Sequence, residues 1–85
     1  MQQTDFADRL RAGEPLVGAW SMLSEPVAVE VIAQAGLDFV VLDGEHSENT
    51  VGDLGDLVRA VEAVDSGTAP VLRAPSADRA AIRRL

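Results

Sequence analysis

Apolar residues along the chain alternate between a strand-like and a helix-like spacing, and this alternation limits the folds open to it. The segment Phe39-Val40-Val41-Leu42 is continuously apolar, as in a strand that is covered on both faces. Two further apolar runs, Leu16–Trp20 and Pro70–Arg73, are also predicted strands. Helix-spaced stretches precede, separate and follow the three runs. The order α-β-α-β-α-β-α predicts parallel strands joined by right-handed crossovers, and therefore an α/β fold.

The first two helical stretches are bounded by residues that commonly start or stop helices. The first is predicted to have Thr4 as its cap and to stop at Gly13. The second is predicted to open at Pro26, because proline is well tolerated in the first turn, and to end at Gly36. The apolar face of the second helix is predicted to contain Val27, Val31 and Ala35, with Ala28 and Ile32 beside them.

The last two helical stretches follow the same logic. Thr50 is predicted to cap the third helix, with Asp53 three residues later, and Gly67 to close the turn that follows it. Its apolar stripe is predicted to contain Val51, Leu54, Leu57, Val58 and Val61. The fourth helix is predicted to open at Ser76 and carries no stop signal. Three parallel strands leave sheet edges uncovered, so the chain is expected to be a piece of something larger. The alternative is a small three-layer domain completed by a partner chain.

Length and charge exclude several classes of function. With 85 residues the chain is at most one small domain, and without Cys it has neither disulfides nor Cys-based zinc sites. A net charge of −7 argues against nucleic-acid and anionic-membrane partners.

The absence of a signal peptide and of a spanning apolar segment favours a cytoplasmic protein. All seven basic residues are Arg. Either adaptation to high salt or a GC-rich genome that favours Arg codons explains this preference for Arg over Lys.

Polar and aromatic residues cluster where the predicted strands end. Trp20 ends the first strand, Asp43 follows the second with Glu45 and His46 after it, and Arg73 ends the third. Active sites of parallel α/β folds form at the C-terminal ends of the strands. These side chains are therefore expected to meet at one rim of the fold.

Several segments resemble, in order and spacing, the opening part of the HpcH/HpaI aldolases. They are Gly18-Ala19-Trp20, Ala35-Gly36-Leu37-Asp38-Phe39-Val40, Leu42-Asp43-Gly44-Glu45-His46 and Pro70-Val71-Leu72-Arg73. The Asp-Gly-Glu-His element after a buried strand is the most specific of them, and the resemblance extends from about Phe6 to Leu85. It implies a (β/α)8 TIM barrel. A barrel of this kind needs roughly 250 residues, so residues 1–85 are expected to be a single partial domain, the first three β/α units, truncated at the C-terminus.

The resemblance also assigns roles to the rim residues. It implies that His46 is the general base, acting directly or through a water, and an ordinary His pKa of about 6.5 suits this task. It implies that Arg73 holds the carboxylate or the enolate oxygen of the pyruvate unit, for which the guanidinium fork is suited. The alternative interpretations are a surface-loop His without a role and a strand-end salt bridge from Arg73 to Asp43 or Glu45.

Three further side chains have a less defined role. The resemblance implies that Trp20 lines the substrate pocket, whereas its alternative is a core or rim-packing ring. Asp43 and Glu45 are expected to orient waters on a catalytic metal ion. Alternatively, the two carboxylates only hold His46 and Arg73 in place.

The function implied by the resemblance is cleavage of 4-hydroxy-2-oxo acids to pyruvate and an aldehyde, assisted by a divalent metal such as Mg²⁺, Mn²⁺ or Co²⁺. The ligands of that metal are expected beyond Leu85, with none in this chain. The family resemblance also implies assembly into trimers of dimers. Two alternatives remain open: a citrate-lyase β-like enzyme acting on acyl-CoA, and a non-catalytic product of a truncated gene.

Overall fold

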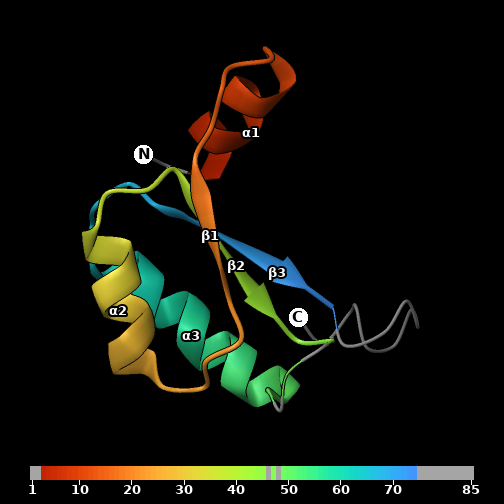
Figure 1. Ribbon diagram of the computed structural model, residues 1–85, viewed down its shortest axis with the longest axis vertical. Coiled ribbons are helices and arrows are strands. Elements are labelled where there is room, and N and C mark those ends of the chain that lie inside the picture. Colours follow the sequence, from red (N-terminus) through yellow and green to blue (C-terminus); the bar gives the residue numbers. More distant parts are fainter. Residues whose placement is uncertain (1–2, 46, 48, 75–85) are drawn as a thin grey trace.

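A computed structural model describes residues 3–45, 47 and 49–74. The elements are α1 (Gln3–Arg11), β1 (Gly18–Ser21), α2 (Pro26–Gln34), β2 (Phe39–Asp43), α3 (Val51–Ala63) and β3 (Ala69–Arg73). The strands form one parallel sheet in the order β1-β2-β3, and α2 and α3 lie on the same side of it (Figure 1). The alternating order of strands and helices is the one predicted. The helix expected from Ser76 lies outside the described residues.

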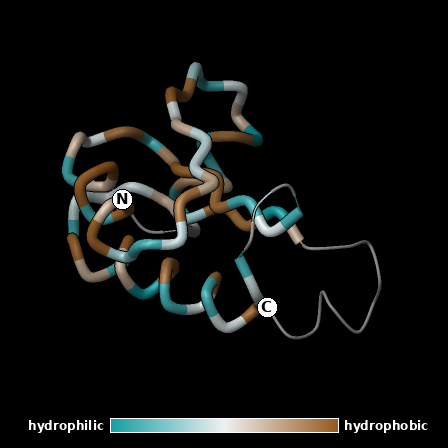
Figure 2. The backbone as a smooth tube through the Cα atoms, turned by 60° about the horizontal axis from the view of Figure 1, so that its bottom comes forward, coloured by the Kyte–Doolittle hydropathy of each residue, from teal (hydrophilic) through white to brown (hydrophobic). Residues whose placement is uncertain are grey.

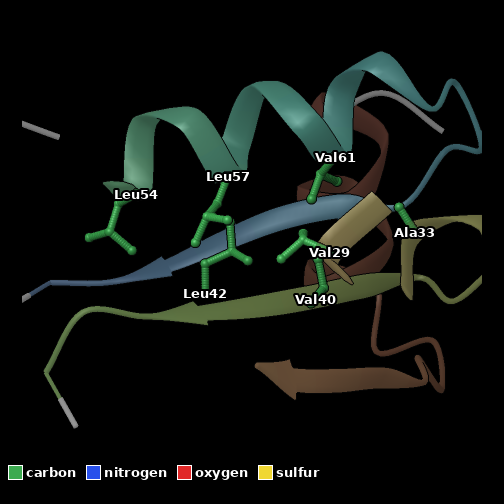
Figure 3. Close-up of a cluster of buried hydrophobic side chains, with 7 residues drawn as sticks. All are labelled: Val29, Ala33, Val40, Leu42, Leu54, Leu57 and Val61. Carbon is green, nitrogen blue, oxygen red and sulfur yellow. The ribbon is translucent and has the colours of Figure 1, made fainter. Parts of the chain in front are cut away.

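The core lies between the sheet and its two covering helices (Figure 3). Leu54, Leu57 and Val61 of α3 are buried over β2, where Val40 and Leu42 are fully buried. Colouring by hydropathy shows the helical turns changing between hydrophobic and hydrophilic residues, as amphipathic helices do (Figure 2). The stripe predicted for α3 is therefore confirmed, although its outer members, Val51 and Val58, are only half-buried.

The face predicted for α2 is wrong. Val27 and Val31 are 68% and 61% exposed, whereas Val29 and Ala33 are fully buried against the sheet and α3. Ile32, which was predicted to lie beside Val27 and Val31, packs against the cluster that contains Val29 and Ala33. The physical reason is that α2 is apolar on most of its sides, so helical spacing alone does not select the side that packs. Contact with β2 and α3 makes the selection.

Helix boundaries follow the predicted signals with one exception, at the start of α1. Thr50 caps α3 and forms a reciprocal capping box with Asp53, as its spacing indicated. The predicted stops at Gly13, Gly36 and Gly67 all have positive φ. However, α1 already includes Gln3, so Thr4 lies within the helix rather than at its cap. Helix α2 begins at Pro26, as predicted, and its cap position, Glu25, makes no side-chain capping bond.

Side-chain alternation divides the sheet residues between two faces. Val40 and Leu42 point to the helices, so their neighbours in β2 belong to the opposite face. On that face the Phe39 ring lies over Gly18, where an added Cβ would come within 2.4 Å of the ring. The Phe6 ring of α1 lies 5.6 Å from the Phe39 ring, centre to centre. Thus α1 covers the N-terminal end of the face opposite α2 and α3, while Trp20, Asp43 and Arg73 lie at its C-terminal end.

A polar cluster attaches α1 and the segment after it to the start of the sheet. Asp38 accepts hydrogen bonds from the Val17 amide at 2.9 Å and from Arg9 Nη1 at 3.1 Å. Arg9 Nε also donates to Glu14 at 2.7 Å. The bond from the Val17 amide, helped by Arg9, lowers the pKa of Asp38 below its ordinary value, although partial desolvation opposes this.

Within the described part of the chain, no helix is both long and apolar enough to cross a bilayer.

Candidate active site

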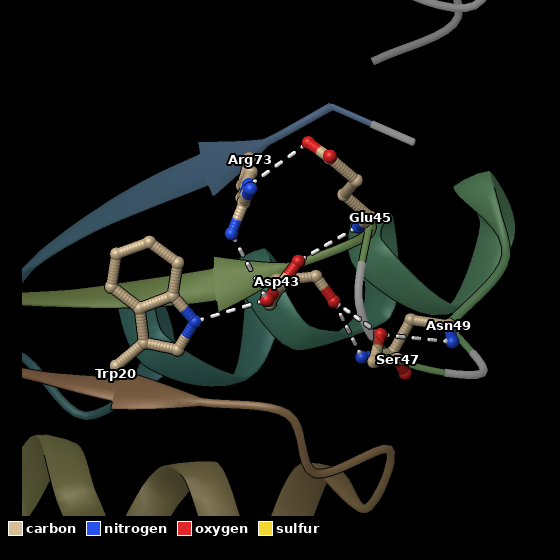
Figure 4. Close-up of polar contacts among 6 residues, drawn as sticks. All are labelled: Trp20, Asp43, Glu45, Ser47, Asn49 and Arg73. Atoms are coloured by element: carbon tan, nitrogen blue, oxygen red, sulfur yellow. Dashed lines mark hydrogen bonds and ion pairs between the residues drawn. The ribbon is translucent and has the colours of Figure 1, made fainter. Parts of the chain in front are cut away.

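At the C-terminal ends of all three strands, side chains come together on the sheet face opposite α2 and α3 (Figure 4). Asp43 and Arg73 are register partners in β2 and β3, and Trp20 pairs with Val41, two residues before Asp43. Residues two apart in a strand share a face, so this register places the indole, the carboxylate and the guanidinium side by side. Trp20, Asp43, Glu45 and Arg73 therefore meet at one rim, as predicted.

Asp43 is the centre of this group and is only 1% exposed. Its Oδ2 accepts a hydrogen bond from Trp20 Nε1 at 3.0 Å, and its Oδ1 accepts one from the Glu45 amide at 2.7 Å. Arg73 Nη1 lies 3.7 Å from Oδ2. A buried carboxylate needs such donors and a nearby cation to remain charged. Asp43 therefore aligns the indole and the guanidinium with each other.

Arg73 is held on three sides. Its Nε donates to Glu45 Oε2 at 3.0 Å, and its guanidinium carbon lies 5.4 Å from the centre of the Trp20 ring, within cation–π range. The strand-end ion pairs of the alternative interpretation are thus present. They leave room for ligand binding, because a guanidinium has five N–H donors and the Arg73 side chain remains 33% exposed.

The loop after β2 is closed by contacts that the sequence did not predict. The Asp43 carbonyl accepts hydrogen bonds from the Ser47 hydroxyl and from Asn49 Nδ2, the latter at 3.2 Å. Asn49 Nδ2 also lies 3.4 Å from the Leu23 carbonyl in the loop after β1. The only sequence signal was a polar stretch between a strand and a helix, which does not reveal these partners.

His46, the predicted general base, lies outside the described residues. Within the described ranges, no group of three or more His, Cys, Asp or Glu residues is arranged to hold a metal ion. The carboxylates of Asp43 and Glu45 are instead engaged with Arg73, Trp20 and the loop backbone. The described residues therefore do not form a ligand set for a divalent metal.

No family model matches the chain, but single proteins of known sequence and structure do. The chain is 38% identical over 77 residues to the hydroxypyruvate/pyruvate aldolase of Paraburkholderia phytofirmans, covering 91% of this chain and 30% of that protein. It is 39% identical over 80 residues to the 5-keto-4-deoxy-D-glucarate aldolase of Escherichia coli, covering 94% and 30% respectively.

A solved structure agrees with these relatives. The crystal structure of an HpcH/HpaI aldolase/citrate lyase family protein from Burkholderia cenocepacia superposes with a TM-score of 0.89 at 34% identity, covering 94% of this chain and 32% of that one. The chain belongs to the HpcH/HpaI aldolase family. Its parallel strands and crossover helices are part of the TIM-barrel fold of that family. It spans about a third of the length of the relatives that it matches.

Proposed function

We propose that this chain supplies the pyruvate-holding part of an aldolase site that cleaves 4-hydroxy-2-oxo acids to pyruvate and an aldehyde. The observation that carries the proposal is Arg73, fixed at a strand end by Asp43, Glu45 and the Trp20 ring. The relatives of the chain are named as aldolases of hydroxypyruvate or pyruvate and of 5-keto-4-deoxy-D-glucarate. A planar, oriented cation at the rim suits a substrate with a carboxylate beside a 2-oxo group.

The proposed reaction requires a base and a place for negative charge. His46 accepts the proton of the 4-hydroxyl, and that oxygen's electrons form the aldehyde carbonyl as the C3–C4 bond breaks. The electron pair of the broken bond moves to the 2-oxo oxygen and gives the pyruvate enolate. The enolate takes up a proton at C3 from water while His46 returns its proton to water, so no net proton is gained or lost. Arg73 stabilises the carboxylate and the developing enolate charge. Its orientation is set in advance, so little rearrangement is needed when the charge forms.

The neighbouring groups complete the proposed site. Trp20 forms one wall of the substrate pocket, with its ring against Arg73 and its Nε1 fixed by Asp43. Asp43 and Glu45 hold Arg73 and orient waters. The divalent metal implied by the family, Mg²⁺, Mn²⁺ or Co²⁺, would supply charge to polarise the 2-oxo group. Its ligands would come from outside the described residues.

The test uses a completed barrel, made by replacing the aligned segment of the E. coli aldolase with residues 1–85 of this chain. We expect it to release pyruvate from a 4-hydroxy-2-oxo acid. His46→Ala should lower kcat about 10²–10⁴-fold, the usual contribution of a general base, and should leave pyruvate binding largely intact. Ser66→Ala, at the opposite end of the sheet, is the matched control. A loss below about threefold for His46→Ala would rule out the assigned base.

One alternative has support from the structural relative, whose family name also includes citrate lyases. Such an enzyme would act on an acyl-CoA instead of a free 2-oxo acid. Adding a CoA thioester to the completed barrel distinguishes the two. Saturable protection of the barrel against thermal unfolding by the thioester, and none by pyruvate, would favour the lyase.

A further inference from the structure

We infer that Asn49 is a positioning residue, which holds the loop after β2 against the loop after β1 and so fixes Glu45 and Arg73. The inference rests on the proposed aldolase function for its kinetic consequence. It goes beyond that function because, among the residues drawn in Figure 4, Asn49 has hydrogen bonds only to the Asp43 carbonyl and to Ser47.

The amide of Asn49 joins two loops that the sequence separates widely. Its Nδ2 donates to the Asp43 carbonyl at 3.2 Å and lies 3.4 Å from the Leu23 carbonyl, 26 residues away. Its backbone N–H donates to the Ser47 hydroxyl at 3.2 Å, and that hydroxyl donates in turn to the Asp43 carbonyl. Ser47 and Asn49 are therefore both tied to the carbonyl of Asp43, and the carboxylate of the same residue accepts the Glu45 amide.

The burial of Asn49 shows which part of its side chain is needed. The residue is 5% exposed, and its Oδ1 has no hydrogen-bond partner among the residues that the structure describes. An unsatisfied buried acceptor is unfavourable, so the side chain is not explained by packing alone. Turning the amide over would set its oxygen against two carbonyl oxygens, which supports the orientation found. The NH₂ group is therefore the functional end, and it serves to bridge the two loops.

The bridge reaches the site through Glu45. The Glu45 carboxylate accepts from Arg73 Nε at 3.0 Å, and the Glu45 amide donates to Asp43 at 2.7 Å. A loop that moves by a fraction of an ångström changes the direction of the guanidinium. Displacements of about 1 Å in a catalytic group are known to cost up to about 10²-fold in rate. Asn49 thus acts on the reaction through Glu45 and Arg73 without touching the substrate.

The experiment compares Asn49→Asp with Thr68→Val in the completed barrel. Asn49→Asp keeps the shape of the side chain but replaces the donor with an oxygen that faces two carbonyls. Thr68 is a matched control, since it is 6% exposed and its hydroxyl lies 3.2 Å and 2.8 Å from the Ala33 and Leu37 carbonyls at the opposite end of the sheet. Both changes remove a buried donor between two carbonyls, and both should lower Tm.

Only the Asn49 change should alter the site. In Asn49→Asp we expect kcat to fall roughly tenfold or more, with KM changed less than about threefold. We also expect the backbone amides of residues 44, 45 and 49 to exchange faster with solvent in this variant. Thr68→Val should leave kcat and those amides unchanged. Asn49→Ser, which keeps a neutral donor but cannot span both carbonyls, serves if the Asp variant does not fold. Its loss of kcat should lie between those of wild type and Asn49→Asp.

The two proposals fail separately. An inactive completed barrel with wild-type sequence counts against the aldolase function, and the exchange rates still test the loop bridge. Exchange rates and kcat in both Asn49 variants that match those of Thr68→Val would overturn the positioning role.

Discussion

The guanidinium of Arg73 is oriented by three different kinds of contact. Its Nε donates to Glu45, its Nη1 lies near Asp43, and its guanidinium carbon lies over the Trp20 ring, 5.4 Å from the ring centre. Each contact restricts a different motion of the group, so its remaining donors point in a fixed direction. A lysine ammonium is a point charge without a plane and cannot reproduce this arrangement.

Arg73→Lys in the completed barrel is therefore expected to be severe although the charge is kept. We expect kcat to fall by about 10²-fold or more, and the affinity for pyruvate to change less, because the enolate charge develops only in the transition state. Steady-state kinetics and pyruvate inhibition measure the two effects. The control is Arg59→Lys on the exposed side of α3, which should behave as wild type. Wild-type kcat in the Arg73 variant would contradict the assignment.

At the scale of single residues, the sequence predicted part of the site. Trp20, Asp43 and Arg73 were found because the ends of parallel strands meet at one edge, which needs only the order of the strands. Asn49 and Ser47 were missed because their role depends on the path of two loops. Nothing in a local pattern indicates that the Leu23 carbonyl comes within reach of Asn49.

Among the elements, α3 was predicted better than α2 because its polar and apolar sides differ more. Leu54, Leu57 and Val61 alternate with exposed Asp56 and Glu62, so helical spacing selects one face. In α2, valines occur all around the helix, and tertiary contacts decide which of them are buried. The beginning of α3 was also predictable, since a capping box is a local interaction that needs no distant partner.

Thr50→Ala should destabilise the completed barrel by about 1 kcal/mol, because the Asp53 amide loses its side-chain acceptor at the start of α3. Chemical denaturation should show a lower midpoint with an unchanged slope. Ser24→Ala is the control before α2, where the cap position belongs to Glu25, and it should have little effect. Equal stability of the two variants would show that the capping box contributes nothing.

The connection of α1 to the sheet should depend on pH through Asp38. The folded protein lowers the pKa of this carboxyl, chiefly through the Val17 amide and then through Arg9. In the unfolded chain the carboxyl has its ordinary pKa, about 3.9, so it binds protons more readily there. Its contribution to stability is therefore present above about pH 4 and is lost as the pH falls through the lower, folded pKa.

Denaturation of the completed barrel between pH 6 and pH 3 tests this dependence. Asp38→Asn should lose less stability across that range than wild type, because the substituted amide does not titrate. Asp56→Asn, which removes an exposed carboxylate on α3, should follow the wild-type curve. Parallel curves for Asp38→Asn and wild type would show that this carboxyl does not couple folding to pH.

At the scale of the whole molecule, the described part of the chain is covered unevenly. Helices bury one face of the sheet, whereas the other is covered only near α1 (Figure 1). Large apolar side chains remain exposed around β1 and α2, among them Val17, Trp20, Met22, Leu23, Val27 and Val31. In a complete TIM barrel the strand edges are paired and the inner face is enclosed. The uneven burial is consistent with a chain that matches only about a third of the length of its relatives.

We therefore expect residues 1–85 alone to be loosely folded. Stability is a small difference between large terms, about 5–15 kcal/mol even in complete domains, and the exposed apolar side chains contribute little of the burial on which it depends. Circular dichroism should show helical signal without a sharp cooperative melt, or the chain should self-associate through its strand edges. A concentration-independent, cooperative transition would contradict this expectation.

The same chain alone should also lack aldolase activity. In the proposed site Arg73 and its neighbours would hold only the pyruvate end of the substrate, and no described group of side chains is arranged to hold the metal that the family implies. Assays with Mg²⁺, Mn²⁺ or Co²⁺ and a 4-hydroxy-2-oxo acid measure this directly, with the completed barrel as the positive control. Turnover above the metal-only rate that persists through further purification, and that disappears in Arg73→Lys, would show that these residues suffice for catalysis. The absence of such turnover would agree with the proposal that the chain places Arg73, Glu45 and Trp20 for groups supplied from elsewhere.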